Sequence, residues 1–288
     1  MKQILLTALV ILLTFTVSWA QLKKTASCCS NPYAAPMAFA MLTHDRQFVS
    51  GHESPLPYKH ISAVGKMITF ATPDGKTGSA YELKATKPSD KYLLVYQEWW
   101  GLNEHIKKEA ETYFNDLKDV NVLALDLYDG KIATEASEAV KLVQAAQPER
   151  IANIIKGAQA YAGQKAEFAS IGWCFGGSWS LQSAIITGKQ AKGCVMFYGM
   201  PEKDVARLKT LNCDVLGFFA GREKNINPAV VKQFEADMKA AGKDVKTKIY
   251  DAEHAFANPS NPNYHREYAA ETHQMAVAYL KDRFDLKK

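Results

Sequence analysis

The feature that most constrains this chain is a glycine-rich hexapeptide at residues 172–177, which has the pattern G-x-C-x-G-G. It follows the apolar run 168–171 and precedes a helix-like stretch at residues 178–187. A sharp turn from strand to helix needs glycines beside it, because a Cβ there would collide with the crossing elements. The pattern therefore predicts a nucleophile elbow that presents Cys174 above a sheet. A small buried cysteine in an ordinary strand–helix turn is the alternative.

Apolar strands alternate with amphipathic helices through most of the chain, which predicts an α/β fold with a mostly parallel central sheet and helices on both faces. A hairpin is predicted first, from residues 66–71 and 79–85 around a Pro-Asp-Gly turn. The later predicted strands are residues 93–96, 120–127, 167–172, 193–198, 215–220 and 245–250. The predicted helices are residues 103–117, 135–146, 148–162, 178–187, 202–208, 228–241 and 264–284. Sites in such sheets lie at the carboxyl ends of the strands.

The first twenty residues have the pattern of a secretory signal peptide. Lys2 gives the positive start, residues 4–17 are largely apolar, and residues 18–20 form a small-x-small cleavage site. An uncleaved membrane anchor is the alternative, but a span needs about 20 apolar residues. We expect residues 1–20 to be removed, residues 21–60 to form an extended leader, and residues 61–288 to form one domain. The protein is then secreted or periplasmic.

Export places the five cysteines in an oxidising compartment, where thiols tend to pair. Cys28 and Cys29 are adjacent and could bridge to each other, bridge to another chain, or stay free. Cys194 and Cys213 each open a predicted strand, so we expect them to be buried or at strand ends. No Cys-x-x-Cys or His-x-x-x-His spacing indicates a metal site, and we expect no cofactor.

The charge distribution argues against a nucleic-acid partner. The net charge of +5 is spread along 288 residues, and no basic block is longer than a pair such as residues 23–24 or 287–288. No segment after the signal could cross a membrane, so we expect no stable membrane insertion once it is removed.

A thiol nucleophile needs a base, and the base needs a group that orients it. In an elbow fold these residues follow later strands in the order nucleophile, acid, histidine. His254 lies after the last predicted strand, and Glu223 is the single carboxylate in the loop after residues 215–220. We therefore predict His254 as the base and Glu223 as its orienting acid. A random loop histidine and a surface glutamate are the alternatives.

The loop after residues 93–96 reads Gln-Glu-Trp-Trp-Gly and forms a third candidate group. In this class of fold that loop supplies the second oxyanion donor. We predict the backbone N–H groups of Trp99 and Phe175 as the oxyanion hole, with Glu98 facing the nucleophile. The aromatic residues nearby predict a substrate pocket, formed by Trp100, Tyr128, Trp173 and Phe256.

Taken together, residues 97–101, 125–130, 172–177 and 254–256 resemble the dienelactone hydrolase family. The resemblance spans roughly residues 60–286 and implies an α/β-hydrolase fold and hydrolysis of carboxylic esters or lactones through an acyl-cysteine. It implies that Cys174 is the nucleophile, that His254 is the base, and that Glu98 contacts the resting thiol and helps to form the thiolate.

The chain departs from the family pattern at two positions. Glu223 stands where the family usually has aspartate. Asn258 stands four residues after His254, where the founding members would have an arginine that binds the substrate carboxylate. We therefore expect a small-molecule ester or lactone as substrate. Thioester or acyl-carbohydrate cleavage by the same residues is one alternative, and a non-catalytic binding or redox protein on this scaffold is another.

Overall fold

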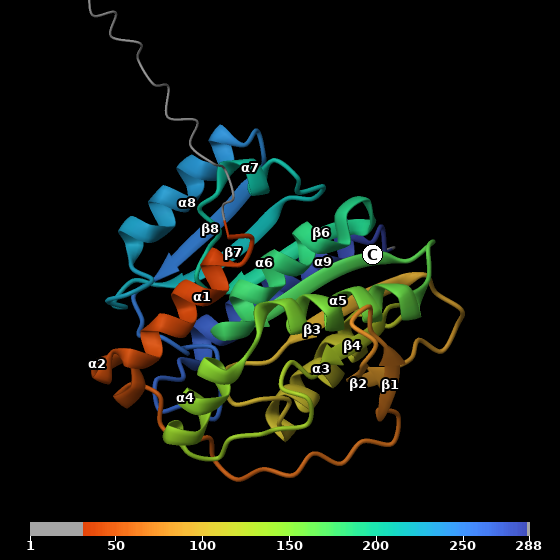
Figure 1. Cartoon of the computed structure of the whole chain (residues 1–288), viewed down its shortest axis with the longest axis horizontal. Coiled ribbons are helices and arrows are strands. Elements are labelled where there is room, and N and C mark those ends of the chain that lie inside the picture. Colours follow the sequence, from red (N-terminus) through yellow and green to blue (C-terminus); the bar gives the residue numbers. More distant parts are fainter. Residues whose placement is uncertain (1–30, 287–288) are drawn as a thin grey trace, which may run out of the picture. The chain divides into compact units, whose positions relative to one another are not determined.

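Eight strands form one sheet in the order β1-β2-β4-β3-β5-β6-β7-β8 (Figure 1). The computed structural model describes residues 31–286. The strands are β1 (Lys66–Ala71), β2 (Thr77–Leu83), β3 (Lys91–Tyr96), β4 (Asn121–Leu125), β5 (Glu167–Trp173), β6 (Ala191–Phe197), β7 (Val215–Ala220) and β8 (Val245–Tyr250). Strand β2 pairs antiparallel with β1 and β4, and all other pairs are parallel. The predicted hairpin and mostly parallel sheet are confirmed.

Helices cover both faces of this sheet, as the sequence pattern predicts (Figure 1). After the hairpin they are α3 (Glu104–Leu117), α4 (Ala136–Ala145), α5 (Pro148–Ala162), α6 (Phe175–Thr187), α7 (Val205–Leu208), α8 (Pro228–Ala240) and α9 (Arg266–Arg283). Helices α5 and α6 pack against each other, and α3 and α9 form a second packed pair. Local signals set their ends: α3 starts where the Asn103 side chain accepts the N–H of Ile106, and α8 starts at Pro228.

Part of the segment before the hairpin is helical where the sequence pattern predicts an extended leader, whereas residues 53–62 form no helix or strand. It forms α1 (Ala34–Met41), a 3₁₀ turn (Leu42–His44) and α2 (Arg46–Ser50), and α1 packs along α6. Helix α2 is capped by Asp45, whose side chain accepts the N–H groups of Gln47 and Phe48. Phe39 and Phe48 are buried with ring centroids 5.7 Å apart. We call residues 34–52 the N-terminal cover.

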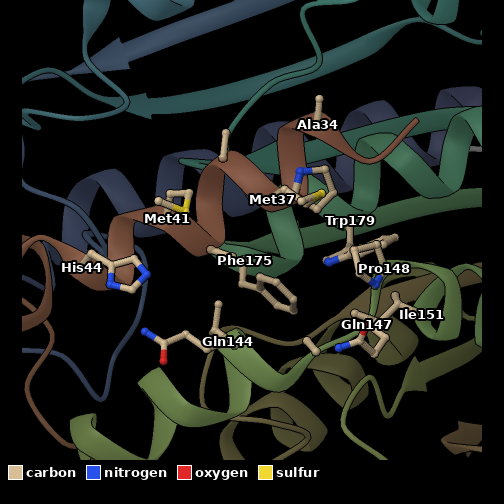
Figure 2. A pocket seen from close by; sticks show the side chains of 15 residues that line it. Ala34, Met37, Met41, His44, Gln144, Gln147, Pro148, Ile151, Phe175 and Trp179 are labelled. Carbon is tan, nitrogen blue, oxygen red and sulfur yellow. The ribbon is translucent and has the colours of Figure 1, made fainter. Parts of the chain in front are cut away.

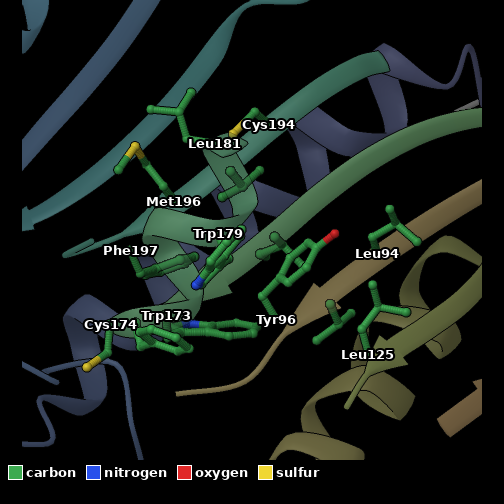
Figure 3. Close-up of a cluster of buried hydrophobic side chains, with 14 of the residues drawn as sticks. Leu94, Tyr96, Leu125, Trp173, Cys174, Trp179, Leu181, Cys194, Met196 and Phe197 are labelled. Atoms are coloured by element: carbon green, nitrogen blue, oxygen red, sulfur yellow. The ribbon is translucent and has the colours of Figure 1, made fainter. Parts of the chain in front are cut away.

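The crossing of β5 and α6 leaves no room for side chains at two glycines. A Cβ on Gly172 would lie 2.1 Å from the carbonyl oxygen of Gly176, and a Cβ on Gly176 would lie 2.3 Å from that of Gln97. Large buried side chains from β3, β5, β6 and α6 fill the space around this crossing, among them Tyr96 and Trp179 (Figure 3). The turn between β5 and α6 is therefore held by packing on all sides.

Several expectations concern residues outside the described range. The candidate signal peptide at residues 1–20 and the adjacent Cys28 and Cys29 fall there, so their predictions stand as made. Within residues 31–286, no helix combines the length and the apolar composition that a bilayer span requires. Cys174, Cys194 and Cys213 are free thiols, and Cys194 is fully buried in β6, as expected.

We expect Gly172→Ala to lower the free energy of unfolding by about 3 kcal/mol, because its methyl group would meet backbone atoms that cannot move aside. Urea denaturation would measure the change. Gly51→Ala is the matched control, since a Cβ there meets its nearest atom at 3.5 Å; its effect should stay within about 0.5 kcal/mol. Equal stability of the two variants would contradict the close-approach argument.

Candidate active site

Cys174 occupies the turn between β5 and α6 in a strained conformation. Its φ of 58° and ψ of −121° lie in a region that costs a non-glycine residue about 1–3 kcal/mol. Its N–H donates to the carbonyl of Phe197 at 3.0 Å, and its side chain lies at the edge of the buried cluster (Figure 3). The residue is 1% exposed, and this burial raises the pKa of the thiol, although the charge of His254 opposes the effect.

His254 and Glu223 lie together at the carboxyl ends of β8 and β7. The Nδ1 of His254 is 2.8 Å from Oε2 of Glu223, and both side chains are buried. Because a carboxylate only accepts, Nδ1 carries the proton of the neutral ring, and Nε2 is the nitrogen that gains or loses a second proton. Burial acts to lower the pKa of His254, but the interactions of the ring with Glu223 and Cys174 together outweigh burial and hold that pKa well above its usual value. The pair has the geometry of an oriented base.

The free nitrogen of His254 faces the thiol. Nε2 of His254 is buried and makes a hydrogen bond to none of the described residues. The Sγ of Cys174, one ring nitrogen of His254 and one ring nitrogen of His52 all lie within 4.8 Å of one another. The structure thus brings together Cys174, His254 and Glu223, the three residues that chain order predicts.

Glu98 follows β3 and is 6% exposed. Burial raises the pKa of its carboxyl to about 7, and this rise is only partly offset by the charge of His254 and by a hydrogen bond from Asn258. That bond joins Nδ2 of Asn258 to Oε2 of Glu98 at 2.5 Å. Asn258, at the position where the family resemblance would place an arginine, therefore holds the carboxyl of Glu98.

His52 is a site residue that the sequence pattern does not reveal. It ends the N-terminal cover, is 5% exposed, and places Nε2 at 3.9 Å from the Sγ of Cys174. Its Nδ1 donates to the carbonyl of Phe48 at 2.6 Å. Burial lowers the pKa of His52 to about 3, so the ring is neutral and its Nε2 can accept a hydrogen bond from the Cys174 thiol. The i, i+4 spacing of Phe48 and His52 after the Asp45 cap is the signal that could have indicated an inward face.

Aromatic rings surround these groups. The His52 ring lies 4.6 Å from that of Trp99 and 4.8 Å from that of His254. Of the predicted oxyanion donors, the N–H of Phe175 points to the Sγ of Cys174, and Trp99 is fully buried. The predicted pocket residues are all buried, and their rings pack on neighbours as follows: Trp100 on Trp99, Tyr128 on Phe175, Trp173 on Phe197, and Phe256 on Tyr198.

Two cavities are lined by side chains of this covered site, and a third lies under the N-terminal cover and is lined by Phe175. One of about 240 Å³ is lined by Glu98, Trp173 and Asn258, and another of about 320 Å³ by His52, Glu223 and His254. A third, of about 640 Å³, is lined by residues of α1, α4 and α5 (Figure 2). Its apolar side chains include Phe175, which begins α6 directly after Cys174.

The nearby arginines do not supply a positive charge to the site. Arg222 binds Asp251 with both Nε and Nη2 at 2.7 Å, and its side chain is 55% exposed. Arg266 begins α9 and is exposed. A substrate carboxylate would therefore meet the amide of Asn258 and the carboxyl of Glu98 in place of an arginine.

The chain is similar to known proteins over most of its length. It is 24% identical over 234 residues to a putative carboxymethylenebutenolidase of Aquifex aeolicus, with 76% of this chain and 98% of that protein covered. It is 28% identical over 204 residues to a putative carboxymethylenebutenolidase of Methylorubrum extorquens, with 62% of this chain and 67% of that protein covered. The crystal structure of a putative dienelactone hydrolase from Klebsiella pneumoniae superposes with a TM-score of 0.64 at 22% identity, covering 75% of this chain and 98% of that one.

The family model agrees with these relatives. The dienelactone hydrolase family matches residues 79–284, a range that includes Glu98, Cys174, Glu223 and His254. The structural similarity shows the α/β-hydrolase fold that the resemblance implies. This chain therefore belongs to the dienelactone hydrolase family and is a hydrolase of the lactone and ester class.

Proposed function

We propose that the protein hydrolyses small carboxylic esters or lactones through an acyl-enzyme intermediate on Cys174. The observation that carries this proposal is the buried thiol on a strained turn, facing an imidazole that Glu223 binds through its other nitrogen. A nucleophile, a base and a group that orients the base are the parts that covalent catalysis needs. All three come from the ends of parallel strands, where this fold places its sites.

In the first half of the reaction, the sulfur of Cys174 attacks the ester carbonyl as its proton leaves toward His254. His254 then gives the proton to the leaving alcohol, and a thioester remains on the enzyme. In the second half, His254 takes a proton from water, the hydroxide attacks the thioester, and the thiol recovers its proton as the acid departs. Glu223 keeps Nδ1 protonated throughout, so that Nε2 is the nitrogen that exchanges protons.

Negative charge that develops on the carbonyl oxygen needs hydrogen-bond donors. We assign this role to the backbone N–H groups of Phe175 and Trp99. The N–H of Phe175 already points to the sulfur of Cys174, and the fully buried Trp99 packs its ring against that of His52. Burial raises the pKa of the Glu98 carboxyl to about 7. In this proposal Glu98 assists the loss of the thiol proton when substrate displaces the contacts that Glu98 makes at rest.

The substrate that fits these surroundings is uncharged and partly apolar. Glu98 and Asn258 occupy the side where an arginine would bind a substrate carboxylate, and Arg222 is engaged by Asp251. The cavity of about 640 Å³ beside Phe175 offers an apolar wall that includes Met37 and Trp179. On the pattern of residues 1–20, we further propose that the protein acts after export, in the periplasm or outside the cell.

Cys174→Ala should abolish turnover of a short-chain aryl ester, with a loss of about 10⁴-fold or more, because no other group can form the acyl intermediate. When the wild-type protein is alkylated with iodoacetamide without prior reduction, turnover should fall in parallel with the labelling of Cys174, which peptide mass spectrometry would locate. Cys213→Ala, which changes a half-buried free cysteine outside the site, is the control and should match the wild type. Retained turnover in Cys174→Ala, or a Cys174 found in a disulfide, would refute the proposal.

Glu223→Gln should lower the pKa of His254, because it removes the negative charge that raises it. An NMR titration of the imidazole would measure the shift, in chains that also carry Cys174→Ala so that the thiol does not contribute. Glu253→Gln is the control, since this exposed glutamate precedes His254 directly in the chain. An unchanged pKa in Glu223→Gln would show that Glu223 does not set the charge of the base.

Turnover should depend on the ionisation of Glu98. Because burial raises its pKa to about 7, the carboxylate gains a proton, and kcat/KM falls, as the pH drops through this value. Glu98→Gln should lower kcat/KM by about 10²-fold or more and remove this acid limb from the pH–rate profile. Glu253→Gln should keep the limb. A limb near pH 7 that survives in Glu98→Gln must be assigned to another group.

A further inference from the structure

Two imidazoles and one thiol meet in the covered site, and each offers one atom that could bind a metal ion. The Sγ of Cys174 and ring nitrogens of His52 and His254 all lie within 4.8 Å of one another, and the three residues are buried. The Nε2 of His52 is 3.9 Å from the sulfur. His52 and Cys174 are 122 positions apart in the chain, which explains why no sequence motif reveals this cluster.

The outer partners of the two histidines match those of metal-binding histidines. Such histidines donate the second ring N–H to a carboxylate or a backbone carbonyl, which fixes the ring and leaves the other nitrogen for the metal. Nδ1 of His254 is held by Glu223 at 2.8 Å, and Nδ1 of His52 by the carbonyl of Phe48 at 2.6 Å. The Nε2 of His254, buried without a hydrogen bond to any described residue, points the same way.

The donor set selects the class of cation. One sulfur and two imidazole nitrogens suit zinc and ions of similar softness, whereas hard cations such as Mg²⁺ prefer oxygen ligands. Around a tetrahedral zinc, ligand atoms lie roughly 3.3–3.8 Å apart, so shifts of about 1 Å would close the cluster. Three protein ligands leave a fourth position for water. The negative charge of Glu223 behind His254 also favours a cation.

We propose that His52, Cys174 and His254 together bind one Zn²⁺ or an ion of similar softness, and that the N-terminal cover completes the site by supplying His52. Binding converts the thiol to a metal-bound thiolate and releases one proton to solvent, with no change of oxidation state. The same ion occupies the free nitrogen of His254. Metal binding and ester hydrolysis then exclude each other; this consequence rests on the proposed function, but binding itself rests on geometry alone.

Co²⁺ is the probe for this site, because it takes the same ligands and reports a thiolate ligand through an ultraviolet charge-transfer band. The full-length protein, reduced and freed of metal with a chelator, should give this band with one Co²⁺ per chain, and Zn²⁺ should bleach it. Cys174→Ala should abolish the band. His52→Ala should weaken Co²⁺ binding by more than about tenfold, since losing even an outer partner of a metal ligand costs this much.

His44→Ala is the matched control, because this exposed histidine lies on the N-terminal cover away from the cluster, and it should bind Co²⁺ as the wild type does. Circular dichroism would establish that each variant is folded. If the folded wild-type protein gives no band with Co²⁺, the proposal is overturned. If His52→Ala binds Co²⁺ with the same affinity as the wild type, His52 is not a ligand. Co²⁺ binding without ester turnover would support the metal site and reject the hydrolase, whereas turnover without the band would do the reverse.

Discussion

The close contact between β5 and α6 is the constraint on which the candidate site depends. The two elements cross with so little space that Gly172 and Gly176 can carry no side chain. The chain must then reverse within one residue, and Cys174 takes a conformation that other residues avoid. Strain of this size persists only because the buried cluster around the crossing holds the turn in place. Packing therefore sets the position of the Cys174 sulfur, and the loops that follow other strands place the remaining groups of the site near it.

The sheet and the Cys174, His254 and Glu223 set could be predicted from the sequence because both follow from local patterns. Parallel strands place all their carboxyl ends at one edge, so residues that directly follow strands meet there whatever their distance in the chain. Cys174, Glu223 and His254 each follow such a strand, and the structure brings them together. The predicted strand and helix limits are close to those observed for the same reason, since each is marked by alternation, glycine or proline.

The N-terminal cover could not be predicted in this way. Residues 34–41 are apolar almost throughout, so no periodicity distinguishes a buried helical face from an irregular segment. The position of His52 depends on contacts with Phe48 and Trp99, and the second of these comes from a loop far along the chain. The raised pKa of Glu98 could not be predicted from the sequence either, because it results from burial that only the folded chain produces.

The N-terminal cover lies outside the range that the family model matches, residues 79–284, although its last residue contacts the sulfur of Cys174. The proposed reacting groups and the N-terminal cover that encloses them on one side therefore come from separate stretches of the sequence. A protein trimmed to the recognisable hydrolase domain would keep every proposed reacting group and still have a different chamber, wider and open to water. The environment of the thiol is a property of the longer chain, and it can be altered by changes in a segment that carries none of the family motifs.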